Sequence, residues 1–186
     1  MTTSGTGRIF FILCWVILLV TAIAAQVLFA GKAKKKAGVE NNIFVIAAFA
    51  VALGWFFVRD SIGTYSGSVI GEAIGAVIMV VGVAGYLWAL FVLRRNWSIS
   101  AEIKEGHTLV TNGPYRFVRH PMYYFMMLVL IGSGLLISNY MILIFSPIVG
   151  IAYYFRAKVE ERMLKEEFAG YGEYAKRTKM LIPGIF

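Results

Sequence analysis

The chain has 186 residues, of which 59% are hydrophobic and 15% are charged, and its formal net charge at pH 7 is +8. A soluble domain is normally about 45–50% apolar and about 25% charged. The composition therefore excludes an ordinary soluble protein and indicates a multi-pass integral membrane protein with the lipid bilayer as a partner. The basic excess adjoins the apolar runs, so we interpret it as an orientation signal and predict no nucleic-acid partner.

The apolar runs predict five transmembrane helices in one domain that covers residues 1–186, because a run of about 20 apolar residues spans a bilayer. Their approximate bounds are 9–30, 43–58, 69–93, 122–137 and 140–155. The first run stops at a group of lysines, as a retained span does, although a cleavable signal peptide is an alternative for this run. The predicted fold class is therefore all-α.

Three details of these runs predict how the helices are arranged. The third run carries glycines at spacings that allow a neighbouring helix to approach closely: Gly71, Gly75, Gly82 and Gly85. The turn Ser138-Asn139 joins the fourth and fifth runs in a tight hairpin, and Pro147 should kink the fifth helix. The charged segment after Phe155 keeps an amphipathic pattern, so we expect this helix to leave the bilayer and bend over its surface.

The distribution of lysine and arginine predicts the topology. All of them except Arg8 and Arg59 fall on one side of the five predicted spans. By the positive-inside rule, the N-terminus lies outside, the C-terminus is cytoplasmic, and residues 94–121 and 156–186 are cytoplasmic segments. We expect these two segments to form a site together, because they flank the same helical hairpin.

The longest polar interval between apolar regions, residues 107–124, is HTLVTNGPYRFVRHPMYY and contains both histidines. Gly113-Pro114 predicts a turn. Pro121 disfavours the α conformation at His120 and suits the first turn of a helix, so His120 should lie just outside a helix N-terminus. Beside Arg119, this position favours an anion.

Carboxylates come from the other end of the hairpin. Glu160 and Glu161 lie about one turn beyond Arg156, and antiparallel packing should bring them to Arg119 and His120. We interpret this group as a functional site. The alternative is a cluster that sets orientation and contacts lipid head groups, which is the interpretation we prefer for Lys158, Lys165 and Glu166.

Other site classes lack their motifs. Two histidines without a cysteine pair or an HExxH spacing give poor support for a metal site, so we predict none. The sequence contains neither a Rossmann fingerprint nor a P-loop, and its serines do not lie in a nucleophile-elbow context. Cys14 lies within the first apolar run without a nearby base, which favours a packing role.

The segments EGHTLVTNGPYRFVRHPMYY and FRAKVEERMLKEEFAGYGEYAKRTKMLIP, separated by the helical hairpin, resemble the isoprenylcysteine carboxyl methyltransferase family. They are similar, more loosely, to the phospholipid N-methyltransferases. The resemblance covers roughly residues 94–183 and rests on the combination of GPY, RHP, a paired EE and the YxxYxxRT…IP ending. The short chain favours a prokaryotic-type member of the family.

The resemblance implies a membrane methyltransferase that uses S-adenosylmethionine, releases S-adenosylhomocysteine and has its active site at the cytoplasmic face. It implies a methyl-donor pocket formed by His107, Leu109, Val110, Gly113, Tyr115, Arg119, His120, Pro121, Tyr123, Glu160 and Glu161. Arg156 and Glu160 are the candidate catalytic residues, with Arg156 holding a carboxylate acceptor such as a C-terminal isoprenylcysteine. The alternatives are a phospholipid N-methyltransferase and a non-enzymatic membrane scaffold, and the acceptor and oligomeric state stay open.

Overall fold

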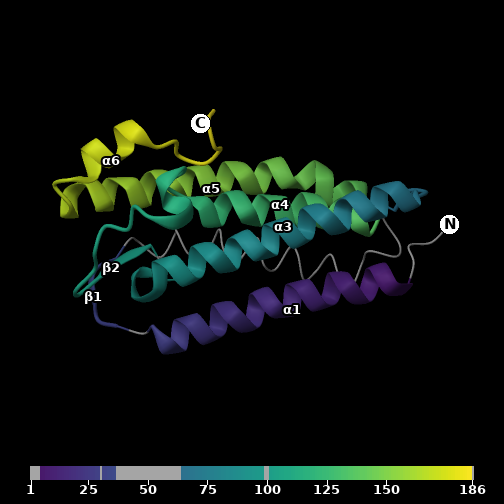
Figure 1. Ribbon diagram of the computed structural model, residues 1–186, viewed down its shortest axis with the longest axis horizontal. Coiled ribbons are helices and arrows are strands. Elements are labelled where there is room, and N and C mark those ends of the chain that lie inside the picture. The colour runs from purple at the N-terminus through teal and green to yellow at the C-terminus, as the bar shows by residue number, and fades with distance from the viewer. Residues whose placement is uncertain (1–4, 30, 37–63, 99–100, 186) are drawn as a thin grey trace.

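The structure is a computed structural model that describes residues 5–29, 31–36, 64–98 and 101–185. Long helices lie side by side in an elongated bundle, with a short helix and a two-stranded ribbon at one end (Figure 1). The predicted span at 43–58 lies outside the described residues. The helices are α1 (Gly5–Leu28), α3 (Val69–Leu93), α4 (Pro121–Leu136), α5 (Tyr140–Glu167) and α6 (Tyr171–Arg177), with the short 3₁₀ turns η1 (Arg94–Asn96) and η2 (Gly113–Arg116).

Within the described residues, three helices are long and apolar enough to cross a membrane: Gly5–Leu28, Val69–Asn96 and Tyr140–Glu167. Helix α4 is apolar but has 16 residues, which is about 24 Å at the usual helical rise. This is less than the roughly 30 Å of a hydrocarbon core. The fourth predicted span is therefore present as a helix, but it is shorter than its neighbours.

Helices α3 and α4 pack closely because glycines face the opposing backbone, as the glycine spacing predicts. A Cβ at Gly75 would lie 2.4 Å from the backbone nitrogen of Leu136, and one at Gly132 would lie 2.7 Å from that of Met79. Real Cβ atoms do not approach backbone atoms so closely, so larger residues would push the helices apart. Met79 is fully buried at this contact.

The α4–α5 hairpin is confirmed. The side chain of Asn139 caps α5 by accepting hydrogen bonds from the N–H groups of Met141 and Ile142, at 3.0 and 3.3 Å. Helix α5 continues through Pro147 and beyond residue 155, the predicted end of the span, as far as Glu167. The chain turns into α6 only after Glu167 (Figure 1), so the fifth helix extends beyond the predicted span as the amphipathic pattern predicts.

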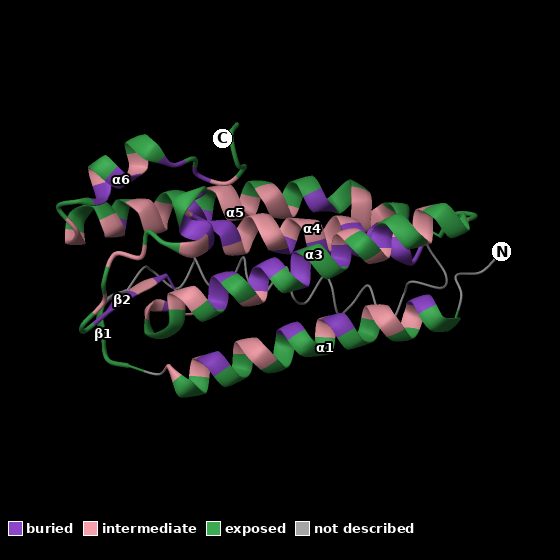
Figure 2. Ribbon diagram, viewed as in Figure 1, coloured by how far each residue is buried: buried purple, intermediate pink, exposed green. Residues whose placement is uncertain are grey.

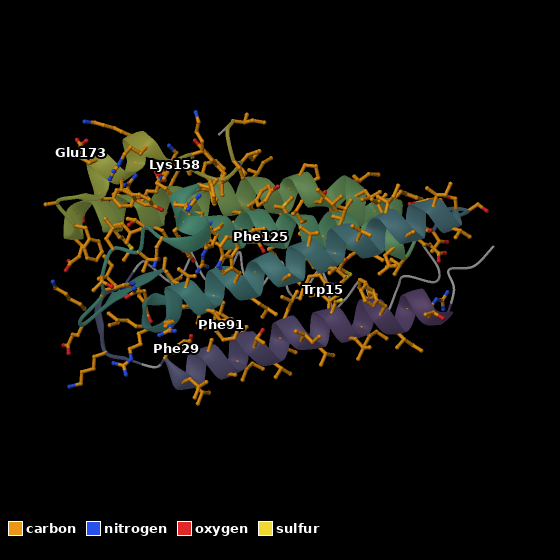
Figure 3. The ribbon with its side chains drawn as sticks, viewed as in Figure 1. Trp15, Phe29, Phe91, Phe125, Lys158 and Glu173 are labelled. Carbon is orange, nitrogen blue, oxygen red and sulfur yellow. The ribbon has the colours of Figure 1, made fainter. Side chains whose placement is uncertain are left out.

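Helix α1 packs along α3 and α4 through one face. Trp15 points from α1 toward these helices (Figure 3), and its Nε1–H donates to the Ser133 hydroxyl at 3.2 Å. The opposite face carries exposed apolar side chains, including Leu13 and Val20 (Figure 2). Exposed apolar surface on a helix of this length suits contact with lipid.

The chain is mostly helical, as predicted, but it also contains a short ribbon that the sequence did not predict. Strands β1 (Ala33–Lys36) and β2 (Glu102–Lys104) form an antiparallel ribbon beside the ends of α1 and α3. Lys104 secures this ribbon, because its buried Nζ donates to the carbonyls of Phe29 at 2.8 Å and Trp97 at 2.7 Å. The lysine run therefore pairs with a distant segment instead of forming a free loop.

Candidate active site

The polar stretch before α4 begins with the turn η2. Gly113 has a φ of +56°, and a Cβ there would lie 2.9 Å from a Val92 methyl, so the backbone and the neighbouring side chain both require glycine. The stretch ends at His120, the N-cap of α4, and Pro121 is the first helical residue. This local structure confirms the helix start that was predicted from the Arg-His-Pro sequence.

The segment before α4 also pairs with the C-terminal tail. The N–H of Arg119 donates to the carbonyl of Lys179 at 2.8 Å, and the N–H of His120 donates to that of Met180 at 3.0 Å. These bonds fix the backbone on which the Arg119 and His120 side chains stand. They also place the tail directly beside the start of α4.

Arg156, Tyr123 and Glu160 form a hydrogen-bonded triad between α4 and α5. The Nε–H of Arg156 donates to the Tyr123 hydroxyl at 2.7 Å and to Glu160 Oε1 at 3.1 Å. The Tyr123 hydroxyl in turn donates to Glu160 Oε1 at 2.6 Å. The side chain of Arg156 is 6% exposed and that of Glu160 is 23% exposed, so this ion pair is largely withdrawn from solvent.

His120 lies between the two carboxylates of α5. Its Nδ1 is 3.4 Å from Glu160 Oε2, and its Nε2 is 3.6 Å from Glu161 Oε1. Burial by itself would lower the pKa of His120, but the nearby carboxylates of Glu160 and Glu161, with their negative charges, outweigh it and raise the pKa above its ordinary value. A protonated imidazole is therefore favoured at this position.

Arg119 completes the group and joins it to the tail. Its Nε–H donates to Glu161 Oε1 at 2.5 Å, and its Nη1 donates to the carbonyls of Ala175 at 3.0 Å and Thr178 at 2.5 Å. Arg119 thus connects the acidic face of α5 to the end of α6. We call Arg119, His120, Tyr123, Arg156, Glu160 and Glu161 the polar cluster.

Stacked rings line the cluster on its apolar side. The rings of His120 and Tyr123 are stacked with centroids 5.6 Å apart, and those of Tyr123 and Tyr153 are stacked at 4.8 Å. Sequence reasoning missed Tyr153. Its position three residues before Arg156 was the available signal, because residues three apart share a helix face.

The other predicted pocket residues lie on the chain that leads to the cluster. The Nδ1 of His107 accepts a hydrogen bond from the N–H of Lys104 at 3.1 Å, and its ring meets Phe168 edge-on at 6.3 Å. Burial lowers the pKa of His107, so its environment favours the neutral form. Leu109 and Val110 are half-buried, whereas Tyr115 is buried and donates its hydroxyl hydrogen bond to the Ala89 carbonyl at 3.4 Å.

Two tyrosines of α6 were also missed as site residues. Tyr171 and Tyr174 are buried and stand on one face of this short helix. The Tyr174 hydroxyl donates to the carbonyl of Tyr115 at 2.7 Å, which fastens α6 to η2. Burial, followed by the charge of Glu161, raises the pKa of Tyr171, so this ring lies close to the cluster. Their spacing of three residues was the signal in the sequence.

Among residues 5–29, 31–36, 64–98 and 101–185, no three His, Cys, Asp or Glu side chains are grouped so that they could hold a metal ion. The arrangement combines two guanidinium groups, an imidazole and two carboxylates at a helix N-terminus. Such a group can bind a ligand that carries charges of both signs, by complementary ion pairs and charge-assisted hydrogen bonds.

Comparison with known proteins identifies the family of this chain. The profile of the isoprenylcysteine carboxyl methyltransferase family matches residues 74–166, which include α4, most of α3 and most of α5. Mouse protein-S-isoprenylcysteine O-methyltransferase is 31% identical over 125 residues, covering 61% of this chain and 42% of the mouse protein. The cobalt-zinc-cadmium resistance protein CzcN of Cupriavidus metallidurans is 27% identical over 117 residues, covering 62% and 53%.

A solved structure shares the fold. The eukaryotic intramembrane Ras methyltransferase ICMT, solved without a monobody, superposes with a TM-score of 0.59 at 24% identity. The match covers 76% of this chain and 52% of that one. The chain thus spans about half the length of the relatives and the structure that it matches.

Proposed function

Because the chain belongs to the isoprenylcysteine carboxyl methyltransferase family, we propose that it transfers a methyl group from S-adenosylmethionine to a carboxylate on a hydrophobic acceptor, such as a C-terminal isoprenylcysteine. It is an integral membrane protein, as its family and its long apolar helices indicate. The observation that carries the proposal is the polar cluster, in which a buried arginine and two carboxylates meet at the start of α4.

The residues of the cluster fit the methyl donor. S-adenosylmethionine carries a sulfonium, an ammonium and a carboxylate, and when bound it supplies the activated methyl group. Glu160 and Glu161 suit the two cations, while His120 and the N-terminus of α4 suit the carboxylate. The Nε2 of His120 is buried without a hydrogen-bond partner, so a polar group of a ligand would satisfy it.

The remaining donor-pocket assignments come from the family and stay part of the proposal. The stacked rings of Tyr123 and Tyr153 offer aromatic faces beside Glu160, and such faces attract a cation. For the segment that leads to the cluster, we propose contacts with the rest of the donor through His107, Leu109, Val110, Gly113, Tyr115 and Pro121.

Arg156 is the proposed residue for the acceptor. It is buried where the apolar part of α5 meets its charged part, so a carboxylate on a lipid-like chain could reach it from the bilayer. Tyr123 and Glu160 hold the Arg156 side chain in one orientation. A carboxylate is already an anion, so the residues need to position it and exclude water instead of removing a proton.

The alternative acceptor, a phospholipid amine, fits the cluster less well. Two arginines and a histidine with a raised pKa outnumber two carboxylates there, which favours an anion over a protonated amine. A scaffold without enzymatic activity would not require a buried and hydrogen-bonded arginine, since burying a charge is costly.

Methyl transfer from labelled S-adenosylmethionine tests the proposal. The purified protein in lipid vesicles should methylate an N-acylated S-prenylcysteine but neither its amide nor phosphatidylethanolamine. Arg156→Ala should lower transfer about 100-fold or more, since it removes a charge-assisted bidentate contact, and Lys158→Ala, an exposed cation on the same helix, should leave it unchanged. Methylation of phosphatidylethanolamine, with Arg156→Ala still active, would contradict the carboxylate assignment.

A further inference from the structure

Buried polar atoms without a partner point to a contact that a ligand completes. Within the described residues, four side chains have such an atom: Ser138 Oγ and Asn139 Nδ2 at the α4–α5 turn, and His120 Nε2 and the Tyr171 hydroxyl near the polar cluster. An unsatisfied buried donor costs stability, and native structures keep few of them. The second pair lies where the methyl donor is proposed to bind.

His120 Nε2 and the Tyr171 hydroxyl both lie near Glu161. The His120 nitrogen is 3.6 Å from Glu161 Oε1, and the charges of Glu161 and Arg119 both act on the Tyr171 hydroxyl. The two residues are 7% and 3% exposed, so bulk water does not solvate them. The structure thus brings two donors without partners and one carboxylate to the same place.

Resting on the proposed donor site, we propose that Tyr171 is a further donor-binding residue and that this place holds the amino-acid end of S-adenosylmethionine. The Tyr171 hydroxyl and His120 Nε2 donate to its carboxylate, and Glu161 accepts from its ammonium. The two donors then face the anionic group and Glu161 faces the cationic group, since an α-amino acid carries one group of each sign.

Tyr174 provides a matched control on the same helix. Its hydroxyl already donates to the Tyr115 carbonyl at 2.7 Å, so it serves the fold. Both tyrosines are buried on one face of α6, and their rings touch at 5.8 Å. Replacing either by phenylalanine removes one oxygen and preserves the ring.

The experiment compares Tyr171→Phe and Tyr174→Phe in the full-length protein. Without ligand, Tyr171→Phe should melt at the wild-type temperature or above it, because it removes an unsatisfied buried group, and Tyr174→Phe should melt lower. By calorimetry, Tyr171→Phe should bind S-adenosylmethionine about tenfold more weakly or worse, as expected for a lost hydrogen bond to a charged group. The affinity of Tyr174→Phe should stay within about twofold of wild type at a temperature where it is folded.

A second ligand distinguishes between the possible results. Decarboxylated S-adenosylmethionine lacks the group that Tyr171 is proposed to contact, so Tyr171→Phe should change its affinity by less than about twofold. If Tyr171→Phe weakens both ligands equally, or weakens neither while wild type binds, Tyr171 does not contact the carboxylate. If folded wild-type protein binds neither ligand, the proposed function itself is wrong.

Discussion

His120 is the residue at which the elements of the site meet. Its backbone caps α4 and pairs with the tail, its ring stacks on Tyr123, and its nitrogens face Glu160 and Glu161. Because the pKa of His120 is raised in the folded protein, its proton stabilises the fold. That contribution is fully present below the unfolded pKa of about 6.5 and is lost as the pH rises through the folded value.

We therefore predict that the wild-type free energy of unfolding falls as the pH rises from about 6.5 through the folded pKa of His120. The loss should be about 1.4 kcal/mol for each unit by which the pKa is raised. Thermal unfolding in detergent at a series of pH values measures it. His107→Gln should retain this dependence, whereas His120→Gln should lack it; an equal slope in both variants would show that another group titrates.

Most residues of the polar cluster could be predicted, because helix-start signals and helical spacing in the sequence indicate their positions. Arg119 and His120 precede a proline that starts a helix, and Glu160 lies one turn beyond Arg156. The role of Arg119 toward the tail could not be predicted, since its partners are the backbone carbonyls of Ala175 and Thr178. Backbone acceptors have no signature in the sequence. The same holds for the two carbonyls that bind Lys104.

At the scale of elements, the α4–α5 hairpin determines which residues meet. With the turn at Ser138-Asn139, counting back along α4 and forward along α5 sets Tyr123 opposite Tyr153, and the two rings stack in the structure. The hairpin was predictable because both runs begin or end at clear signals. The β1–β2 ribbon was not, because pairing between segments so distant in sequence depends on where the helices place them.

The close α3–α4 contact depends on glycines, and this can be tested by substitution. We predict that Gly75→Ala and Gly132→Ala each destabilise the protein by about 1–3 kcal/mol, because the added Cβ meets backbone that cannot move aside. Melting temperature in detergent measures the loss.

Gly150→Ala on α5 is the control for these two variants. Its Cβ would lie 3.4 Å from the flexible end of Met127, and alanine favours a helix, so we expect little change or a small gain. Equal stability of all three variants would show that α3 and α4 are not in such close contact.

At the scale of the whole molecule, exposed cations gather at one end of the bundle. This end carries the ribbon, η1, η2 and α6 (Figure 1) and also the polar cluster. Figure 3 shows Lys158 and Glu173 here. Among the residues whose burial is described, the exposed cations are Lys32, Lys34, Arg94, Arg95, Arg116, Lys158, Arg162, Lys165, Lys176, Arg177 and Lys179. By the positive-inside rule we propose that this end, and hence the active site, faces the cytoplasm.

Cysteine labelling in intact cells tests this orientation. Ser66 is exposed before α3 at the opposite end of the bundle, and Lys176 is exposed on α6. In a Cys14→Ala background, a membrane-impermeant thiol reagent should label Ser66→Cys in intact cells and Lys176→Cys after lysis. Labelling of Lys176→Cys in intact cells would reverse the orientation.

The central claim is that the polar cluster binds the methyl donor, and calorimetry with S-adenosylmethionine and S-adenosylhomocysteine tests it most directly. We predict that the wild-type protein binds both and that Glu160→Gln and Glu161→Gln, shown to be folded, each bind S-adenosylmethionine about tenfold more weakly or worse. Glu173→Gln should bind as wild type does, because this glutamate is 71% exposed and pairs with Lys176. Folded wild-type protein that binds neither ligand, or glutamine variants that bind like wild type, would contradict the account.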